Sequence, residues 1–161
     1  MPVIAMVSPK GGVGKTTATV NLACQLARAA QVKILDADPN RPVEQWSKLP
    51  NKPANVSVVT GVDEDNIIDH IEQAKSDTQF VLVDCEGTAS RTVAYAVGSA
   101  DLVIIPTQGS QLDARQAGRA LGLVQAAEKM GRRKIPVRVL FTRSSPAIRT
   151  KNLDNVQTQL R

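Results

Sequence analysis

Residues 3–17 read VIAMVSPKGGVGKTT: a short apolar run, a glycine-rich loop and the start of a longer pattern. The run VIAMV is almost continuously apolar, as expected of a strand that is covered on both faces of a parallel sheet. From Lys15 to Ala30, apolar residues recur at helical spacing. The stretch therefore predicts a strand, a tight loop and a helix in succession, which is the context that a phosphate-binding loop requires.

The loop has the chemistry needed to bind phosphate groups. Its glycines allow backbone angles that point successive N–H groups inward, and the following helix adds partial positive charge at the same place. The ammonium group of Lys15 can neutralise phosphate oxygens, and the hydroxyl of Thr16 can bind Mg²⁺. The candidate phosphate-binding residues are Gly11, Gly12, Val13, Gly14, Lys15, Thr16 and Thr17.

The loop departs from the general phosphate-loop pattern, GxxxxGK followed by Ser or Thr. Pro9 occupies the position of the first glycine, and a second lysine, Lys10, lies on the upstream edge of the loop. One lysine is enough to neutralise a bound phosphate group, so the second lysine needs an explanation of its own.

The rest of the chain alternates short β-branched runs with helical patterns. Strands are predicted at residues 32–36, 56–59, 80–84, 101–106 and 135–141, and helices at 64–75, 90–98 and 112–130, the last stopping at Gly131. This alternation predicts a single α/β domain over residues 1–161, a doubly wound and mostly parallel sheet flanked by helices. Residues 150–161 carry a helical pattern that stops without a cap, which is typical of a fragment or of a chain whose last elements are missing.

Three carboxylates fall at the carboxyl ends of predicted strands, namely Asp36, Asp38 and Asp84. Ligands of open parallel sheets bind at these strand ends, so we expect the carboxylates beside the phosphate loop. Asp84 closes an apolar strand and is the candidate for binding Mg²⁺ directly or through water. Asp38 either joins the metal shell or only caps the next turn.

Composition limits the remaining possibilities. The chain has four aromatic residues, which argues against stacking platforms for single-stranded nucleic acid. Its two cysteines lie far apart, which argues against a zinc site and favours a reducing compartment. No apolar run approaches the ~18 residues of a membrane span, and the N-terminus lacks the features of a signal peptide. We therefore expect a cytoplasmic protein.

Charge is distributed unevenly along the chain. Residues 1–109 contain 9 Lys and Arg against 12 Asp and Glu, whereas residues 110–161 contain 11 against 3, so the two parts carry net charges of −3 and +8. Such an asymmetry indicates either a surface that faces a polyanion or a solvated basic face without a partner.

Three stretches of the sequence resemble one family. KGGVGKTT (10–17) is similar to the deviant Walker A motif of the ParA/MinD family of P-loop ATPases, in which the extra lysine corresponds to Lys10. ILDADPN (34–40) resembles the family's second motif, DxDPQ, with Asn40 in the last position. FVLVD (80–84) and the stretch DLVIIPTQGSQLDAR (101–115) resemble its Walker B strand and the segment beyond. Within the family, the chain looks closest to short plasmid-partition ParA proteins and to relatives in conjugative DNA transfer.

The resemblance implies an ATP hydrolase that binds ATP and Mg²⁺ and forms a homodimer with ATP. In the family, the upstream lysine reaches across the dimer interface to the partner's nucleotide, which would explain Lys10. Asp36 matches the family's water-orienting carboxylate, so the implied catalytic residues are Lys10, Lys15 and Asp36.

The resemblance also suggests roles for the other polar residues of the site. The implied metal-binding residues are Thr16, Asp38 and Asp84. Arg143 follows a strand where relatives place a residue that contacts the base, and the alternative is an ordinary surface charge. Glu86 is unusual after the Walker B strand, and its effect on hydrolysis is left open.

Partition ATPases of this family bind DNA without sequence preference when dimerised by ATP, and a ParB-like partner stimulates hydrolysis. The resemblance therefore implies a nucleoid-associated protein. Candidate DNA contacts are Arg115, Arg119, Arg132, Arg133 and Lys134. The alternatives are an ATPase that assists conjugative DNA transfer, a MinD-like ATPase that works at a membrane surface, a biosynthetic enzyme, against which Lys10 counts, and a structural nucleotide-binding protein.

Overall fold

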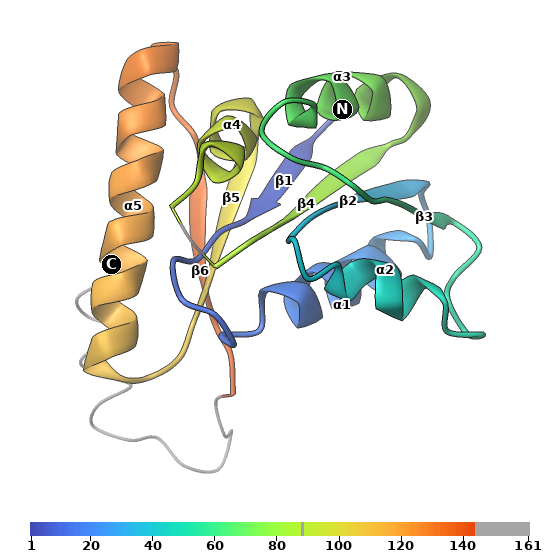
Figure 1. The fold of residues 1–161 in the computed structure, drawn as a ribbon, viewed down its shortest axis with the longest axis horizontal. Helices are drawn as coiled ribbons and strands as arrows, with labels where there is room; N and C mark the ends of the chain where they lie inside the picture. Colours follow the sequence, from blue (N-terminus) through green and yellow to red (C-terminus); the bar gives the residue numbers. More distant parts are fainter. Residues whose placement is uncertain (88, 144–161) are drawn as a thin grey trace.

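The computed structural model describes residues 1–87 and 89–143, which form one layered α/β domain (Figure 1). One sheet of six strands has the order β3-β2-β4-β1-β5-β6, and every neighbouring pair is parallel. The strands are β1 (Val3–Met6), β2 (Val32–Ala37), β3 (Val56–Val59), β4 (Phe80–Cys85), β5 (Leu102–Thr107) and β6 (Val137–Phe141). The predicted fold class and strand set are thus confirmed.

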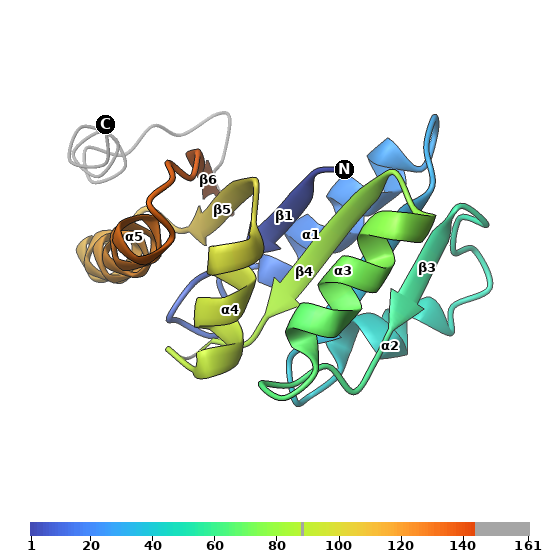
Figure 2. The ribbon, with the colours of Figure 1, turned by 90° about the horizontal axis from the view of Figure 1, so that it is seen from above.

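Helices cover both faces of the sheet (Figures 1 and 2). Helices α1 (Lys15–Leu26) and α2 (Pro42–Ser47) lie on one face, and α3 (Ile67–Asp77), α4 (Arg91–Ser99) and α5 (Gln111–Gly131) lie on the other. Each face has its own core of buried aliphatic side chains, because the inward stripes of the helices meet alternate residues of the strands. Strands covered on both sides explain the continuous apolar runs of the sequence.

The observed helix boundaries differ from the predicted ones by up to four residues, and one helix was not predicted. Helix α1 ends at Leu26 rather than near residue 30, because tight turns from Arg28 to Gln25 and from Ala29 to Leu26 replace the last helical turn. Helix α2 was not predicted. Helix α5 runs through Gly131, and Arg132 takes the left-handed C-cap conformation with φ 49°. The helix expected at 150–161 lies outside the described residues.

The topology brings the polar strand ends together. From β1 the chain passes through the phosphate loop and α1 to β2, toward one edge of the sheet. After β4 it passes over β1 to β5, toward the other edge. Ligands of doubly wound sheets bind where the direction of winding changes in this way. Within the described residues, no helix is long and apolar enough to cross a membrane.

Candidate nucleotide site

The phosphate loop has the backbone geometry that its glycines predict. Gly12 and Gly14 have φ angles of 72° and 94°, in the left-handed region that residues with a Cβ rarely adopt. Gly14 is the N-cap of α1, and the side chain of Lys15 is buried beneath the loop, with its ammonium 3.3 Å from the carbonyl oxygen of Lys10. A cavity of about 390 Å³ is lined by Gly11, Gly12, Gly14, Lys15, Thr16, Thr17, Asp38, Asn40, Gly87 and Arg143.

Asp84 lies directly under α1 and is fully buried. The hydroxyl of Thr16 donates to its Oδ2 over 2.7 Å, and the hydroxyl of Thr19 donates to its Oδ1 over 2.9 Å. Burial raises the pKa of Asp84 to about 6, against the lowering effects of the Thr16 and Thr19 hydrogen bonds. The carboxylate is therefore beside Thr16, as predicted, and accepts a second hydroxyl that was not predicted.

Asp36 is the neighbour of Asp84 in the sheet, because the two residues are in register on β2 and β4. Its Oδ2 accepts the backbone N–H of Glu44 over 2.9 Å, whereas its Oδ1 is buried without a hydrogen-bond partner. Burial raises the pKa of Asp36, and the nearby charge of Asp38 acts in the same direction. Buried polar atoms are nearly always hydrogen-bonded, so the free Oδ1 makes Asp36 a candidate for contact with a bound group.

Asp38 has a different arrangement. Its Oδ1 accepts the backbone N–H of Asn40 over 2.9 Å and the side-chain amide of Asn40 over 3.0 Å. This is the turn-capping alternative of the sequence analysis, although the residue also lines the cavity.

Gly87 closes the site from the side of β4. A Cβ atom at this position would lie 3.0 Å from the nitrogen of Gly11 and 3.2 Å from its Cα, so the strand end and the loop approach too closely for a side chain.

Arg143 also lines the cavity and has a φ of 54°. It also lines a groove of about 450 Å³ between α1 and the end of β6, and its contact with a base stays a prediction.

Lys10 lies outside the cavity lining and binds within its own chain. Its ammonium is 2.7 Å from Oδ1 of Asp113, in the first turn of α5, and its side chain is 41% exposed. Asp113 is itself buried and forms a capping box with Ser110. Although burial opposes the effect, the hydrogen bonds from Lys10 and Ser110 lower the pKa of Asp113, which keeps it ionised.

The residues of the cavity fit a magnesium nucleotide. Mg²⁺ prefers oxygen ligands and usually takes one or two carboxylates together with substrate phosphates. Thr16 and Asp84 offer such oxygens beside the loop. Within residues 1–87 and 89–143, no group of three or more His, Cys, Asp or Glu side chains is placed to hold a metal ion without such phosphates.

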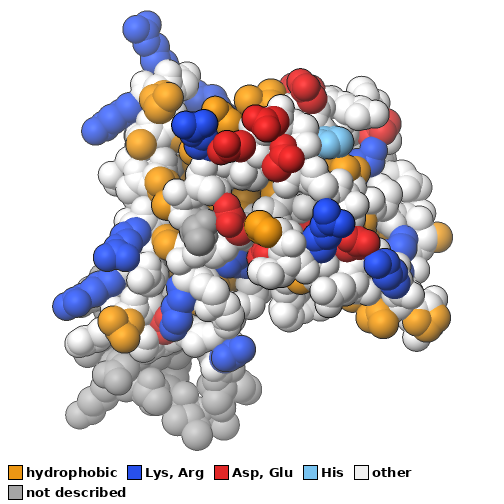
Figure 3. All heavy atoms as spheres, in the orientation of Figure 1, with side chains coloured by type: hydrophobic (Ala, Val, Ile, Leu, Met, Phe, Trp, Pro, Cys, Tyr) orange, Lys and Arg blue, Asp and Glu red, His pale blue; other side chains and the backbone are white. Residues whose placement is uncertain are grey.

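The five predicted DNA contacts have different surroundings. Figure 3 shows Lys and Arg side chains along the edge of the molecule formed by α5, whereas Asp and Glu gather over α3 and α4. Arg115 and Arg119 are exposed on α5. Arg133 donates to the carbonyl oxygens of Gly98 and Ala100, both over 2.7 Å, so it joins α5 to the end of α4.

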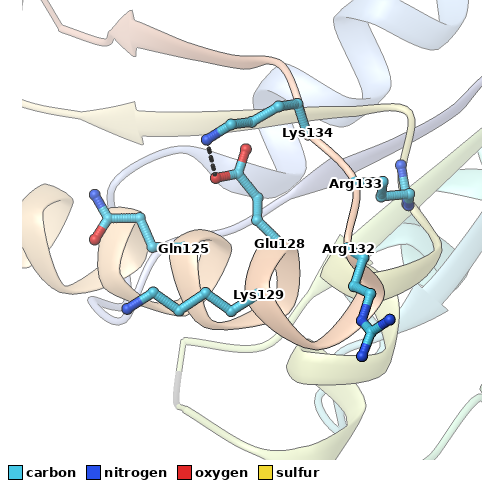
Figure 4. A pocket seen from close by; sticks show the side chains of 6 residues that line it. All are labelled: Gln125, Glu128, Lys129, Arg132, Arg133 and Lys134. Atoms are coloured by element: carbon cyan, nitrogen blue, oxygen red, sulfur yellow. Dashed lines mark hydrogen bonds and ion pairs between the residues drawn. The ribbon is translucent and has the colours of Figure 1, made fainter.

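The end of α5 forms a basic hollow of about 430 Å³ (Figure 4). Lys134 folds back onto Glu128, with its ammonium 3.1 Å from Oε2, and Glu128 also accepts the backbone N–H of Ile135. Lys129 and Arg132 extend into solvent with no ion pair among the described residues. Lys129 is therefore an exposed cation without an ion pair among the described residues, like Arg132, although it was not among the five predicted DNA contacts.

Sequence reasoning missed the residues that support the site from a distance. Thr19 carried a usable signal, because a position three residues after Thr16 lies on the same face of a helix. Asp113 and Thr142 carried none, since their contacts with the loop span 103 and 129 residues of sequence.

Comparison with known proteins identifies the family. The family model described as VirC1 protein matches residues 1–160. The chain belongs to the VirC1 family. A protein named ParA from Rhizobium radiobacter is 40% identical over 161 residues, which are 99% of this chain and 72% of the relative. The VirC1-family chain spans 53–64% of the length of several further relatives.

Solved structures confirm the fold of this VirC1-family chain. An ATP complex of a McdA variant from Cyanothece matches with a TM-score of 0.85 at 17% identity, covering 99% of this chain and 78% of that protein. MinD from Pyrococcus horikoshii, complexed with Mg-ADP, matches with a TM-score of 0.76 at 19% identity, covering 99% and 77%. The resemblance to the ParA/MinD type of ATPases is therefore confirmed at the level of family and fold.

The buried carboxylate of Asp84 gives a prediction about stability. Its folded pKa of about 6 lies above its usual value of 3.8, so the native protein holds a proton that the unfolded chain releases as the pH rises from about 4 to 6. Stability should fall over this range, and Asp84→Asn should remove most of that fall. Without nucleotide or metal at pH 7, removal of the buried charge should contribute up to about 3 kcal/mol of stability, less the cost of the hydroxyl hydrogen bond that the asparagine amide group cannot accept.

Urea unfolding across this pH range measures the effect. Asp65→Asn, at an exposed carboxylate, is the control and should leave the pH profile unchanged. An Asp84→Asn variant whose stability falls between about pH 4 and 6 as steeply as that of the parent would contradict the raised pKa of Asp84.

Proposed function

We propose that this chain is an ATP-dependent, dimerising ATPase of the ParA type that binds DNA without sequence preference and drives plasmid or chromosome partition. The observation that carries the proposal is the pairing of a complete phosphate loop with a second lysine outside it. Lys15 is buried under the loop, whereas Lys10 is half exposed and bound by a single ion pair. The relatives named ParA and plasmid partition protein support the same function.

The residues of the cavity divide the work on a nucleotide. The loop N–H groups and Lys15 would bind the phosphate oxygens, and Thr16 and Asp84 would hold Mg²⁺, which supplies charge neutralisation at the phosphates. The free Oδ1 of Asp36, which lies on the strand beside Asp84, would orient the attacking water, although Asp36 is not among the residues that line the cavity. Arg143 would contact the base from the end of β6.

Lys10 would exchange one anion for another when two copies meet. Two subunits that each carry a polyphosphate repel one another unless cations cross the interface, and charges act strongly where water is excluded. Without Lys10, Ser110 still donates to Oδ2 of Asp113 from both its backbone and its hydroxyl, whereas Oδ1 loses the partner that Lys10 supplies. Release of Lys10 therefore leaves one oxygen of a buried carboxylate unpaired, and the attraction of Lys10 to the partner's phosphates would have to offset that cost.

DNA would bind along the outer face of α5. This face carries Arg115, Arg119, Lys129 and Arg132, and the acidic residues of the helix are buried or already bonded. Contacts of this kind are made to phosphates, need no aromatic residues and are sensitive to salt. The ATP-bound dimer would be the form held at the nucleoid, and a ParB-like partner would stimulate hydrolysis and so release the DNA.

DNA retention with ATP, with ADP and without nucleotide, across about 50 to 200 mM salt, tests the proposal. Two duplexes of unrelated sequence are compared. Binding that needs ATP, falls with salt and ignores sequence supports it. Binding to anionic liposomes instead would favour the MinD-like alternative, and ATP binding with no turnover in either case would favour a structural nucleotide-binding protein. A role in conjugative DNA transfer, the other alternative, would appear as preferential binding to a duplex that carries a transfer sequence.

Lys10→Ala should leave ATP binding within about threefold of the parent, because Lys10 does not line the cavity. It should abolish dimerisation by ATP, which sedimentation velocity measures. Lys15→Ala is the matched variant and should lose ATP binding itself. A Lys10→Ala protein that still dimerises with ATP would contradict the role in the partner's site.

Asp36→Ala should bind ATP and dimerise, yet hydrolyse ATP at least about a hundredfold more slowly, as for loss of a positioned general base. Phosphate release under saturating ATP measures this. Asp65→Ala, at an exposed carboxylate outside the cavity lining, is the control and should retain the activity of the parent. Unchanged turnover in Asp36→Ala would assign the water to another residue.

The double variant Lys129→Ala/Arg132→Ala should weaken DNA binding for every sequence and lower the salt dependence by about two ion equivalents. Arg28→Ala/Lys48→Ala removes the same charge from exposed positions near α1 and α2, and should bind DNA as the parent does. Equal losses in the two double variants would show that net charge, not the face of α5, determines binding.

A further inference from the structure

Side chains outside the glycine-rich motif hold the carbonyl groups of the phosphate loop. The hydroxyl of Thr142 donates to the carbonyl oxygen of Val13 over 2.7 Å. On the preceding peptide, the side-chain amide of Gln108 donates to the carbonyl oxygen of Gly12 over a longer 3.4 Å. Both donors follow strands, Thr142 after β6 and Gln108 after β5, so the sheet itself determines their positions.

Thr142 is the better fixed of the two. Its backbone N–H donates to the carbonyl oxygen of Thr107, at the end of β5, over 2.8 Å. The same oxygen lies 3.1 Å from the Thr142 hydroxyl, but a hydroxyl has one proton, and the shorter contact is the one to Val13. The Thr142 methyl carbon lies 3.5 Å from where a Cβ on Gly14 would be, so the side chain also packs against the loop.

Fixing the carbonyl of Val13 fixes the next N–H group as well. A peptide unit is planar and trans, so its C=O and N–H point to opposite sides. Gly14 has a φ of 94° and, because it lacks a side chain, its backbone can adopt many other conformations. The hydrogen bond from Thr142 therefore restrains the direction of the Gly14 N–H. Gly14 is one of the residues that line the phosphate cavity.

We propose that Thr142 is a positioning residue of the phosphate loop, which orders the Val13–Gly14 peptide for binding a nucleoside triphosphate. Thr142 lines the groove behind the loop rather than the phosphate cavity, so it acts through the loop and not by touching phosphate. The inference rests on the proposed nucleotide site but not on dimerisation or DNA binding.

The test compares Thr142→Val with Thr142→Ser in the full chain. Valine keeps the methyl packing and loses the donor, whereas serine keeps the donor and loses the methyl. The dissociation constant of a fluorescent ATP analogue should rise about tenfold in Thr142→Val, as for one lost hydrogen bond, and return to within about threefold of the parent in Thr142→Ser. KM for ATP should follow, with kcat changed less than about twofold.

Thr78→Val is the matched control. Thr78 is a buried threonine at the end of α3, and its hydroxyl has no hydrogen-bond partner. Its replacement should leave ATP affinity unchanged. Circular dichroism of each variant without nucleotide verifies the fold, and if Thr142→Val does not fold, Thr142→Ala against Thr142→Ser makes the same comparison.

The outcomes separate the two proposals. Failure of the parent chain to bind ATP would overturn the nucleotide site and this inference with it. If the parent binds ATP and Thr142→Val binds it equally tightly, the positioning role alone would be overturned. Loss of affinity in Thr142→Ser as large as in Thr142→Val would assign the effect to packing of the methyl group and would also overturn it.

Discussion

The position of the phosphate loop depends on the two hydroxyl hydrogen bonds that α1 makes to Asp84. Thr16 and Thr19 lie one helical turn apart and bind the two oxygens of one carboxylate, so they fix both the rotation and the height of α1 over the sheet. Gly14 and Lys15 begin the same helix and inherit this position. Asp84 remains buried because these donors offset part of the cost of removing a carboxylate from water.

The sequence predicted the central part of this arrangement because its signals are local. The apolar strand, the glycine loop and the helical period lie within one continuous stretch, and parallel strands with buried faces leave a plain pattern. Helix α2 left no such pattern, since six residues are too few to establish a helical period, and Pro42 and Glu44 in its first turn are weak starting signals without one. Asp113 and Thr142 could not be found at all, because a contact across more than a hundred residues is determined by topology rather than by spacing.

Lys10 has an observed partner, Asp113, in its own chain and a proposed partner, the nucleotide of a second copy. Its ion pair with Asp113 joins the loop to α5 across the top of β5, and the exposed side of the pair is screened by water. The proposed exchange would set the loss of this ion pair, in which the Asp113 carboxylate is buried, against the stronger attraction of Lys10 to a phosphate where water is excluded. The capping box leaves Asp113 with donors on its other oxygen, so the helix keeps its N-terminus when the lysine moves.

Helix α5 therefore connects the two halves of the proposed function. Its 21 residues span about 30 Å, from the Asp113 that binds Lys10 to the basic hollow at its other end. Arg133 joins that far end to α4 through two carbonyl oxygens, and α4 follows the strand that carries Asp84. A change of partner by Lys10 would act on the first turn of a helix whose far end is attached to the C-terminal end of α4. Under the proposed function, α5 would thus connect the DNA-binding face with the Lys10–Asp113 pair beside the phosphate loop.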